Sequence, residues 1–113
     1  MERDAATFLD IARAAALIQQ FVAGLPKEQF LIDLKTQSAV LHQLTVLGEA
    51  VKRLSPAFRV QHPILPWSLM AGMRDHLIHA YDVVDLEEIW NTATNDIPDV
   101  VTKITPLLPS QPE

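Results

Sequence analysis

The residues best suited to chemistry lie together in one short segment, Arg74-Asp75-His76-Leu77-Ile78-His79-Ala80-Tyr81. Cleavage of an RNA phosphodiester needs a base for the 2′-hydroxyl proton, an acid for the leaving oxygen and a cation for the charged transition state. Imidazole and guanidinium groups can supply all three without a metal, because histidine titrates near neutral pH and the planar arginine fork matches two phosphate oxygens. The segment therefore predicts an RNA-cutting site.

The spacing of these residues suits a helix only in part. On an ideal helix Asp75 and His79 lie one turn apart, so the carboxylate can orient the imidazole and stabilise its protonated form. Arg74 and Tyr81 share a face, but Arg74 and His79 are about 140° apart around the axis. Either the helix distorts near His79 or a second subunit completes the site. From the residues alone, a solvent-facing helix with an Asp75–His79 pair remains an open alternative.

The elements that must position this segment are helical. Apolar residues recur at three- and four-residue steps in four stretches of the chain, residues 4–23, 33–54, 67–81 and 86–104. Gly24, with Pro26 two residues later, should end the first helix, and Ser55-Pro56 should end the second. We expect an all-α fold, an up-and-down antiparallel four-helix bundle with short extra turns.

Single residues in the second half of the chain refine these boundaries. Gly72, inside the third stretch, indicates a close helix approach, because glycine otherwise costs helix stability. Asp85 and Glu88 have the spacing of a capping box at the start of the last helix. Pro98 should kink that helix, or restart it with Asp96 as the cap.

Composition limits the class of protein. The chain has 113 residues and no cysteine, which predicts one domain over residues 1–113, with a loose tail from about 106, and excludes thiolate chemistry. The absence of a membrane-length apolar run and of a signal-peptide pattern predicts a soluble cytoplasmic protein that does not contact membranes. The net charge of -5 opposes indiscriminate phosphate binding, so a nucleic-acid partner would need a local basic patch.

The histidines offer a metal site as an alternative. His76 and His79 stand three residues apart and could share a metal on a helix. The chain lacks both the His-Glu-x-x-His pattern and the paired Glu-x-x-His of di-iron bundles. We therefore predict no metal and no cofactor. A metal-binding bundle would instead show stoichiometric metal in the purified protein.

The segment at 74–81 resembles the Arg-(Asn/Asp)-x-x-x-His-x-Tyr signature of HEPN-domain proteins, and the chain resembles the HepT toxin group of that superfamily over about residues 3–106. Further runs are similar to that group's consensus in the same order: Lys35-Thr36-Gln37, Gly48-Glu49-Ala50, Lys52-Arg53-Leu54-Ser55-Pro56, Pro66-Trp67, Ala71-Gly72-Met73 and Val84-Asp85-Leu86. The resemblance implies a HEPN-like bundle. Many HEPN motifs have asparagine where this chain has Asp75.

The resemblance also implies an activity, that of a metal-independent endoribonuclease toxin acting as a homodimer, with two motifs lining a cleft at the interface. His79 would be the general acid or base, Arg74 the phosphate clamp, and Asp75 the residue that orients them. The split directions of Arg74 and His79 on a straight helix agree with a dimeric site. Candidate RNA contacts are Tyr81, His76, Lys35 and Arg53, with Lys52 and Arg59 as further candidates for a basic rim.

A partner follows from the same resemblance. An MntA-like nucleotidyltransferase antitoxin would block the toxin by transferring AMP to Tyr81, which would place bulk and negative charge where the RNA phosphate must lie. The competing hypothesis is a non-catalytic helical dimer module that binds a nucleotidyltransferase partner, with the motif serving only as a contact.

Overall fold

Two long antiparallel helices, α1 (Glu2–Val22) and α3 (Leu34–Arg53), form the base of the fold in the computed structural model. The structure describes residues 2–73, 75, 78–79 and 83–109. The other elements, in chain order, are α2 (Lys27–Phe30), α4 (Pro56–Gln61), α5 (Trp67–Ala71), β1 (Ile78–His79), β2 (Val83–Val84), α6 (Leu86–Asn91), the π-helical turn η1 (Thr92–Asp96), α7 (Ile97–Ile104) and the 3-10 turn η2 (Thr105–Leu107).

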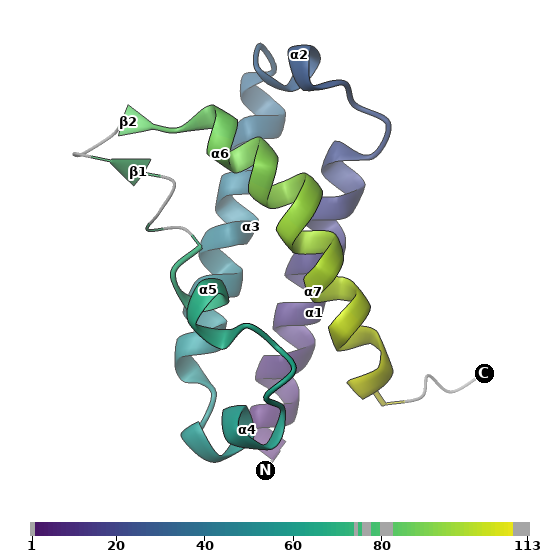
Figure 1. The fold of residues 1–113 in the computed structure, drawn as a ribbon, viewed down its shortest axis with the longest axis vertical. Coiled ribbons are helices and arrows are strands. Elements are labelled where there is room, and N and C mark those ends of the chain that lie inside the picture. Colours follow the sequence, from purple (N-terminus) through teal and green to yellow (C-terminus); the bar gives the residue numbers. More distant parts are fainter. Residues whose placement is uncertain (1, 74, 76–77, 80–82, 110–113) are drawn as a thin grey trace.

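The helices run alternately up and down. In Figure 1 the chain rises along α1, descends along α3, turns back through α4 and α5, and descends again along α6 and α7, which cross in front of α1 and α3. The pair β1–β2 projects to the side of the bundle beyond α3. The predicted all-α class and up-and-down order are confirmed. Within the described ranges, no helix is long and apolar enough to span a membrane.

The core lies where the apolar faces of three helical segments meet. The predicted faces of α1, α3 and the α6–α7 segment are buried, as the fully or nearly fully buried side chains show: Phe8, Ile11, Ala15, Ile18, Val40, Leu44, Leu47, Val51, Ile89, Ile97, Val100 and Ile104. Burying aliphatic side chains of this size contributes about 1.5–3 kcal/mol each. This core fixes the long helices independently of any functional residue.

Helix ends follow the local signals in the sequence. Gly24 has a φ of 72°, the left-handed conformation expected after α1. Asp33 caps α3 by accepting a hydrogen bond from the Thr36 amide at 3.1 Å. Asp85 caps α6 by accepting one from the Glu88 amide, also at 3.1 Å, so that predicted cap is confirmed.

The last helix differs from its prediction. Residues 86–104 form one continuous helical segment, in which the π-helical turn η1 precedes Pro98. Asp96 has helical backbone angles and makes no side-chain capping bond, so the predicted restart with Asp96 as cap is wrong. The wider turn accommodates a proline, which has no amide to donate to the preceding turn. Beyond α7, Leu108 still packs against the core.

The predicted third helix is much shorter than expected. α5 ends at Ala71, Gly72 follows as its C-cap, and the expected continuation to Tyr81 is wrong for the residues described. β1 and β2 pair antiparallel instead, with His79 opposite Val83. The chain leaves the helix at a glycine and continues into β-branched residues, which favour extended backbone. The argument from helical spacing, with Asp75 and His79 one turn apart, therefore fails.

One buried carboxylate joins the start of α1 to the start of α4. Asp4 accepts hydrogen bonds from the Ser55 amide at 3.0 Å and the Ser55 hydroxyl at 2.7 Å, and the same hydroxyl oxygen accepts one from the Phe58 amide at 3.1 Å. The Ser55 hydroxyl, and secondarily its amide, hold the pKa of Asp4 below its ordinary value of 3.8. The resulting stabilisation is complete above the unfolded pKa and is lost as the pH falls through the folded pKa.

We predict that Asp4→Ala lowers the melting temperature at neutral pH and flattens its fall between about pH 5 and pH 2, because the variant lacks the carboxylate whose protonation weakens the fold. Thermal melts followed by circular dichroism across that range measure both effects. The matched control is Asp10→Ala, since Asp10 makes only an exposed pair with Arg13 at 3.7 Å. Identical acid profiles for the two variants would contradict this role of Asp4.

Candidate functional site

In chain order the predicted catalytic segment follows α5 and precedes α6, and the structure describes its residues Asp75, Ile78 and His79, with β1 lying beside α3 (Figure 1). Asp75 lies in an exposed turn, and the backbone of His79 lies in β1. Arg74, His76 and Tyr81 lie outside the described residues. The distances among the predicted catalytic side chains therefore stay predictions, and the site is built here from the residues that hold the segment.

Asp75 contacts the last part of α3. Its carboxylate Oδ2 lies 3.9 Å from the Lys52 ammonium, which also lies 3.3 Å from Oε2 of Glu49. All three side chains are about half exposed, so each pair is worth no more than about 1 kcal/mol. The contact nevertheless places Asp75 beside the Glu49–Lys52 turn of α3.

α5 reaches this position through a close approach to α3. A Cβ added at Gly48 would lie 3.2 Å from the carbonyl oxygen of Ala71 and 3.5 Å from that of Met70. The side chain of Met70 is fully buried, and that of Met73 nearly so. The predicted close helix approach exists, but the glycine that permits it is Gly48 on α3, whereas Gly72 ends α5.

The start of α5 is held by Trp67. Its indole Nε1 donates hydrogen bonds to the backbone carbonyls of Arg59 at 3.0 Å and His62 at 2.9 Å. Its ring meets Phe58 edge-on, with 6.3 Å between the ring centroids. The connection from α4 to α5 is thereby fixed at the end that leads into the candidate site.

The residues predicted to form a basic rim do not all lie at the same end of α3. Lys35 and Arg53 are both exposed, but they stand in the first and last turns of α3, about 27 Å apart along the helix axis. Arg53 adjoins Lys52 at the end nearest Asp75, and Lys35 lies at the far end. Val84 of β2, by contrast, lines a cavity with Ser38 and Leu41 in the first half of α3. Arg53 is therefore nearer Asp75, and Lys35 is nearer the β1–β2 pair.

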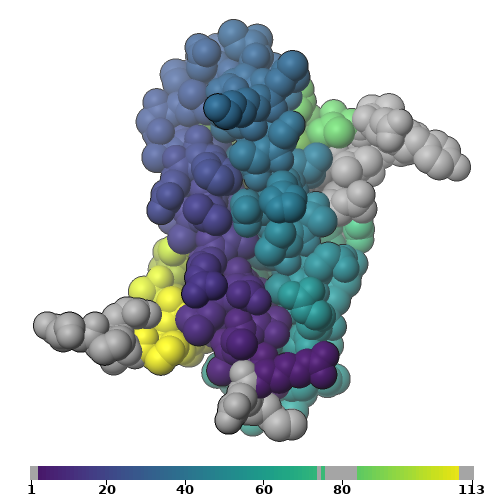
Figure 2. All heavy atoms as spheres, turned by 180° about the vertical axis from the view of Figure 1, so that it is seen from behind, coloured from purple at the N-terminus to yellow at the C-terminus, as the bar shows by residue number. Residues whose placement is uncertain are grey.

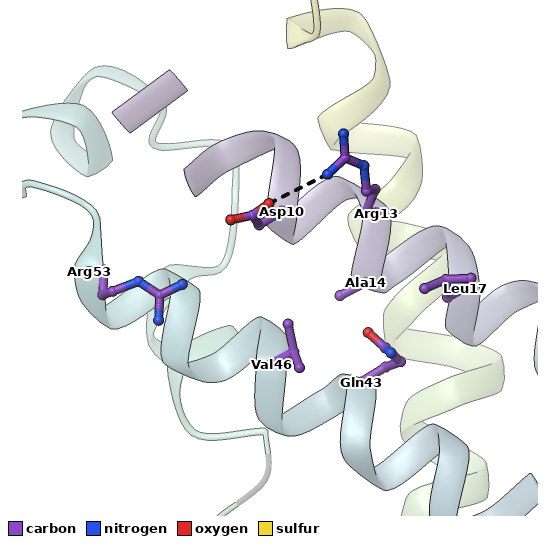
Figure 3. A pocket seen from close by; sticks show the side chains of 7 residues that line it. All are labelled: Asp10, Arg13, Ala14, Leu17, Gln43, Val46 and Arg53. Carbon is purple, nitrogen blue, oxygen red and sulfur yellow. Dashed lines mark ion pairs between the residues drawn. The ribbon is translucent and has the colours of Figure 1, made fainter. Parts of the chain in front are cut away.

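Arg53 also borders a cavity on the side of α3 that faces α1. This cavity, of about 240 Å³, lies between α1 and α3, and Figure 3 shows Asp10, Arg13, Ala14 and Leu17 lining it from α1, with Gln43, Val46 and Arg53 from α3. Figure 2 shows that no further helix covers this rear face of α1 and α3. Arg53 thus lines this cavity together with Asp10 and Arg13.

A feature that the sequence analysis missed is the segregation of charge. Residues 50–74 hold four of the nine lysines and arginines and none of the aspartates and glutamates. The sequence already contains this segregation of charge, but the net charge of the whole chain does not reveal it. The acid-free segment forms the end of α3, then α4 and α5, and leads directly to Asp75.

Among the residues that the structure describes, no three histidine, aspartate or glutamate side chains are close enough to share a metal ion. His76 and the segment around it fall outside those residues, so the predicted absence of a metal remains to be tested by elemental analysis.

Comparisons with known proteins give consistent matches. Residues 11–107 match the model of a family described as ribonuclease HepT-like. A probable ribonuclease HepT of Thermococcus cleftensis is 46% identical over 98 residues, covering 87% of this chain and 89% of the relative. A candidate RNase of Methanocaldococcus jannaschii is 38% identical over 108 residues, covering 95% and 89%. One of Caldanaerobacter subterraneus is 39% identical over 87 residues, covering 77% and 78%. No solved structure matches significantly.

We predict that enlarging Gly48 disturbs the seat of α5. Gly48→Leu should cost about 1–3 kcal/mol of unfolding free energy, because the side chain must displace the Ala71 backbone. Gly48→Ala should stay within about 1 kcal/mol of wild type, since the gain in helix propensity offsets a tight contact. Urea denaturation measures both, with Ser38→Leu, at an exposed position of the same helix, as the control. A Gly48→Leu protein as stable as that control would contradict the close approach.

Proposed function

The chain belongs to the ribonuclease HepT-like family, as its sequence resemblance indicated, and we propose that it is a metal-independent endoribonuclease toxin of a toxin–antitoxin pair. The observation that carries this proposal is the extent of the family match, which runs over residues 11–107 and so includes the whole segment from Arg74 to Tyr81. The names of the relatives, a probable ribonuclease HepT and candidate RNases, support the same activity.

The proposed reaction uses three residues of this segment. His79 moves the proton of the 2′-hydroxyl or of the leaving oxygen, and Arg74 holds the phosphate through its planar guanidinium. Asp75 orients them. The contact between Asp75 and Lys52 supports this role, because it fixes the residue next to Arg74 against α3 and moderates the repulsion between the Asp75 carboxylate and an RNA phosphate.

We also propose that the active form is a homodimer with both motifs at one interface. The different directions of Arg74 and His79 were expected for a straight helix through residue 81. Because α5 ends at Ala71, these directions do not support a dimer. The proposal now rests on the family resemblance. It is supported by the position of β1 and β2, which project from the bundle beside α3, where a second copy can approach them (Figure 1).

An MntA-like nucleotidyltransferase antitoxin is the proposed regulator. Transfer of AMP would form a bond between the Tyr81 phenolic oxygen and the α-phosphorus of ATP, with pyrophosphate leaving and the phenolic proton passing to a base. The added phosphodiester would repel RNA from the motif.

We predict that the purified protein cuts single-stranded RNA and that His79→Ala and Arg74→Ala each reduce the rate by about 10²-fold or more, because one removes the acid or base and the other the phosphate clamp. Gel analysis of total RNA measures the cleavage. Lys103→Ala is the control, since Lys103 pairs with Asp99 on α7, away from the motif. Intact RNA with the wild type and both variants, all folded, would instead favour the non-catalytic module that binds a nucleotidyltransferase.

A second prediction concerns Tyr81. Tyr81→Phe should still arrest growth when expressed alone, since the phenol is proposed as the modification site, and co-expression of an MntA-like nucleotidyltransferase that rescues the wild type should fail to rescue it. Growth curves and intact mass, with wild-type protein as the reference, measure the two effects. Rescue of Tyr81→Phe as complete as that of wild type would exclude Tyr81 as the regulatory site.

A further inference from the structure

The acid-free segment at residues 50–74 encloses an open apolar cleft at α4. The cleft has a volume of about 390 Å³ and is lined by Pro56, Arg59, Val60, Pro63 and Trp67. Val60 is 77% exposed, so the cleft is accessible from solvent. The cleft thus combines two proline rings, an indole, an aliphatic side chain and a guanidinium.

Trp67 is preorganised as one wall of this cleft. Both of its hydrogen bonds, to the carbonyls of Arg59 and His62, use the indole edge, and the contact with Phe58 supports the ring from within the fold. A ring held in this way loses little conformational freedom when a flat group packs against it. Rigid aromatic side chains beside cations are the platforms on which single-stranded nucleic-acid bases stack.

A second cleft adjoins the first and supplies charge. It has a volume of about 330 Å³, shares Pro56 with the apolar cleft, and is lined also by Arg3, Asp4, Arg53, Leu54 and Ser55. The Asp4 carboxylate in this lining accepts its hydrogen bonds from Ser55. Within the described part of the chain, no carboxylate lies within ion-pair distance of Arg53 or Arg59. Both guanidiniums are therefore available to phosphate groups, in a protein whose net charge is -5.

We propose that these two clefts form a subsite for single-stranded RNA, in which a base stacks in the cleft of Val60 and Trp67 while Arg53 and Arg59 hold the flanking phosphates. This inference rests on the proposed ribonuclease function and extends it. The segment that forms the clefts continues through α5 to Asp75. Because α4 and the β1–β2 pair lie toward opposite ends of the bundle (Figure 1), a strand bound in the clefts must extend along α5 to reach the motif. The apolar lining favours unpaired nucleic acid over a duplex, whose bases are already stacked, and Arg53 and Arg59 attract its phosphates.

The direct test measures RNA affinity apart from cleavage. The probe is a fluorescein-labelled single-stranded RNA of about twelve nucleotides, within the range of single-strand site sizes, titrated by anisotropy against the His79→Ala protein. Adding Val60→Asp should weaken binding about 5-fold or more, because one stacked base is lost. Adding Ile32→Asp is the matched control, since Ile32 is 74% exposed and follows α2 at the other end of the bundle.

Charge and stacking can be separated by two further readouts. Adding Arg59→Ala should reduce the slope of log Kd against log salt by about 0.7, whereas Lys103→Ala should leave it unchanged. In a Trp90→Phe background, Trp67 is the single remaining tryptophan, and its fluorescence should be quenched by the single-stranded RNA and not by the corresponding duplex.

The outcomes separate this inference from the proposed function. Equal affinities for the Val60→Asp and Ile32→Asp proteins, while the wild type still cuts RNA, would overturn the subsite and leave the ribonuclease intact. A wild type that neither binds nor cuts RNA would overturn both. If Val60→Asp halves the mass measured by light scattering and leaves RNA affinity unchanged, the cleft is a contact between copies of the chain and the inference is wrong.

Discussion

The contact between α3 and α5 at Gly48 is the constraint on which the candidate site depends. The carbonyls of Met70 and Ala71 approach α3 so closely that only a glycine fits without adjustment, and Gly72 ends α5 directly after this contact. The chain therefore leaves α5 at a fixed point. The reactive segment begins two residues later, and its Asp75 lies beside Lys52 of α3.

The runs that carry the family resemblance outside the motif now have physical roles. Gly48 admits α5, Lys52 contacts Asp75, Ser55 caps α4 and joins it to Asp4, and Trp67 fixes the start of α5 through two backbone carbonyls. These residues are dispersed in the sequence but surround the path into and out of the motif. The family signature thus describes a scaffold for the segment as well as the reactive groups. The buried apolar core shared by α1, α3 and α7 holds this scaffold together.

The sequence predicted well what local chemistry determines. Helix faces followed apolar periodicity, and Gly24 and Asp85 ended or began helices as side-chain and backbone preferences require. Prediction failed where apolar periodicity conflicted with weaker local signals. Periodicity extended the third helix to Tyr81, although Gly72 and the β-branched residues after it favour a break, and the π-helical turn before Pro98 has no signal as strong as a cap. The sequence shows that residues 50–74 contain basic but no acidic residues, although the net charge of the whole chain does not reveal it. Only the structure shows that these residues surround two clefts at α4.

The central claim is that this chain cuts RNA with its own side chains, using the 2′-hydroxyl of the substrate as nucleophile. The most direct measurement is cleavage of a defined RNA by the purified, unmodified protein in excess EDTA, with mass spectrometry of the new ends. The account predicts that cleavage persists and that the products carry 2′,3′-cyclic phosphates, because attack by the 2′-hydroxyl on the adjacent phosphorus expels the 5′-oxygen. Cleavage that stops in EDTA and returns with added divalent metal, or products ending in 3′-hydroxyl groups, would contradict it.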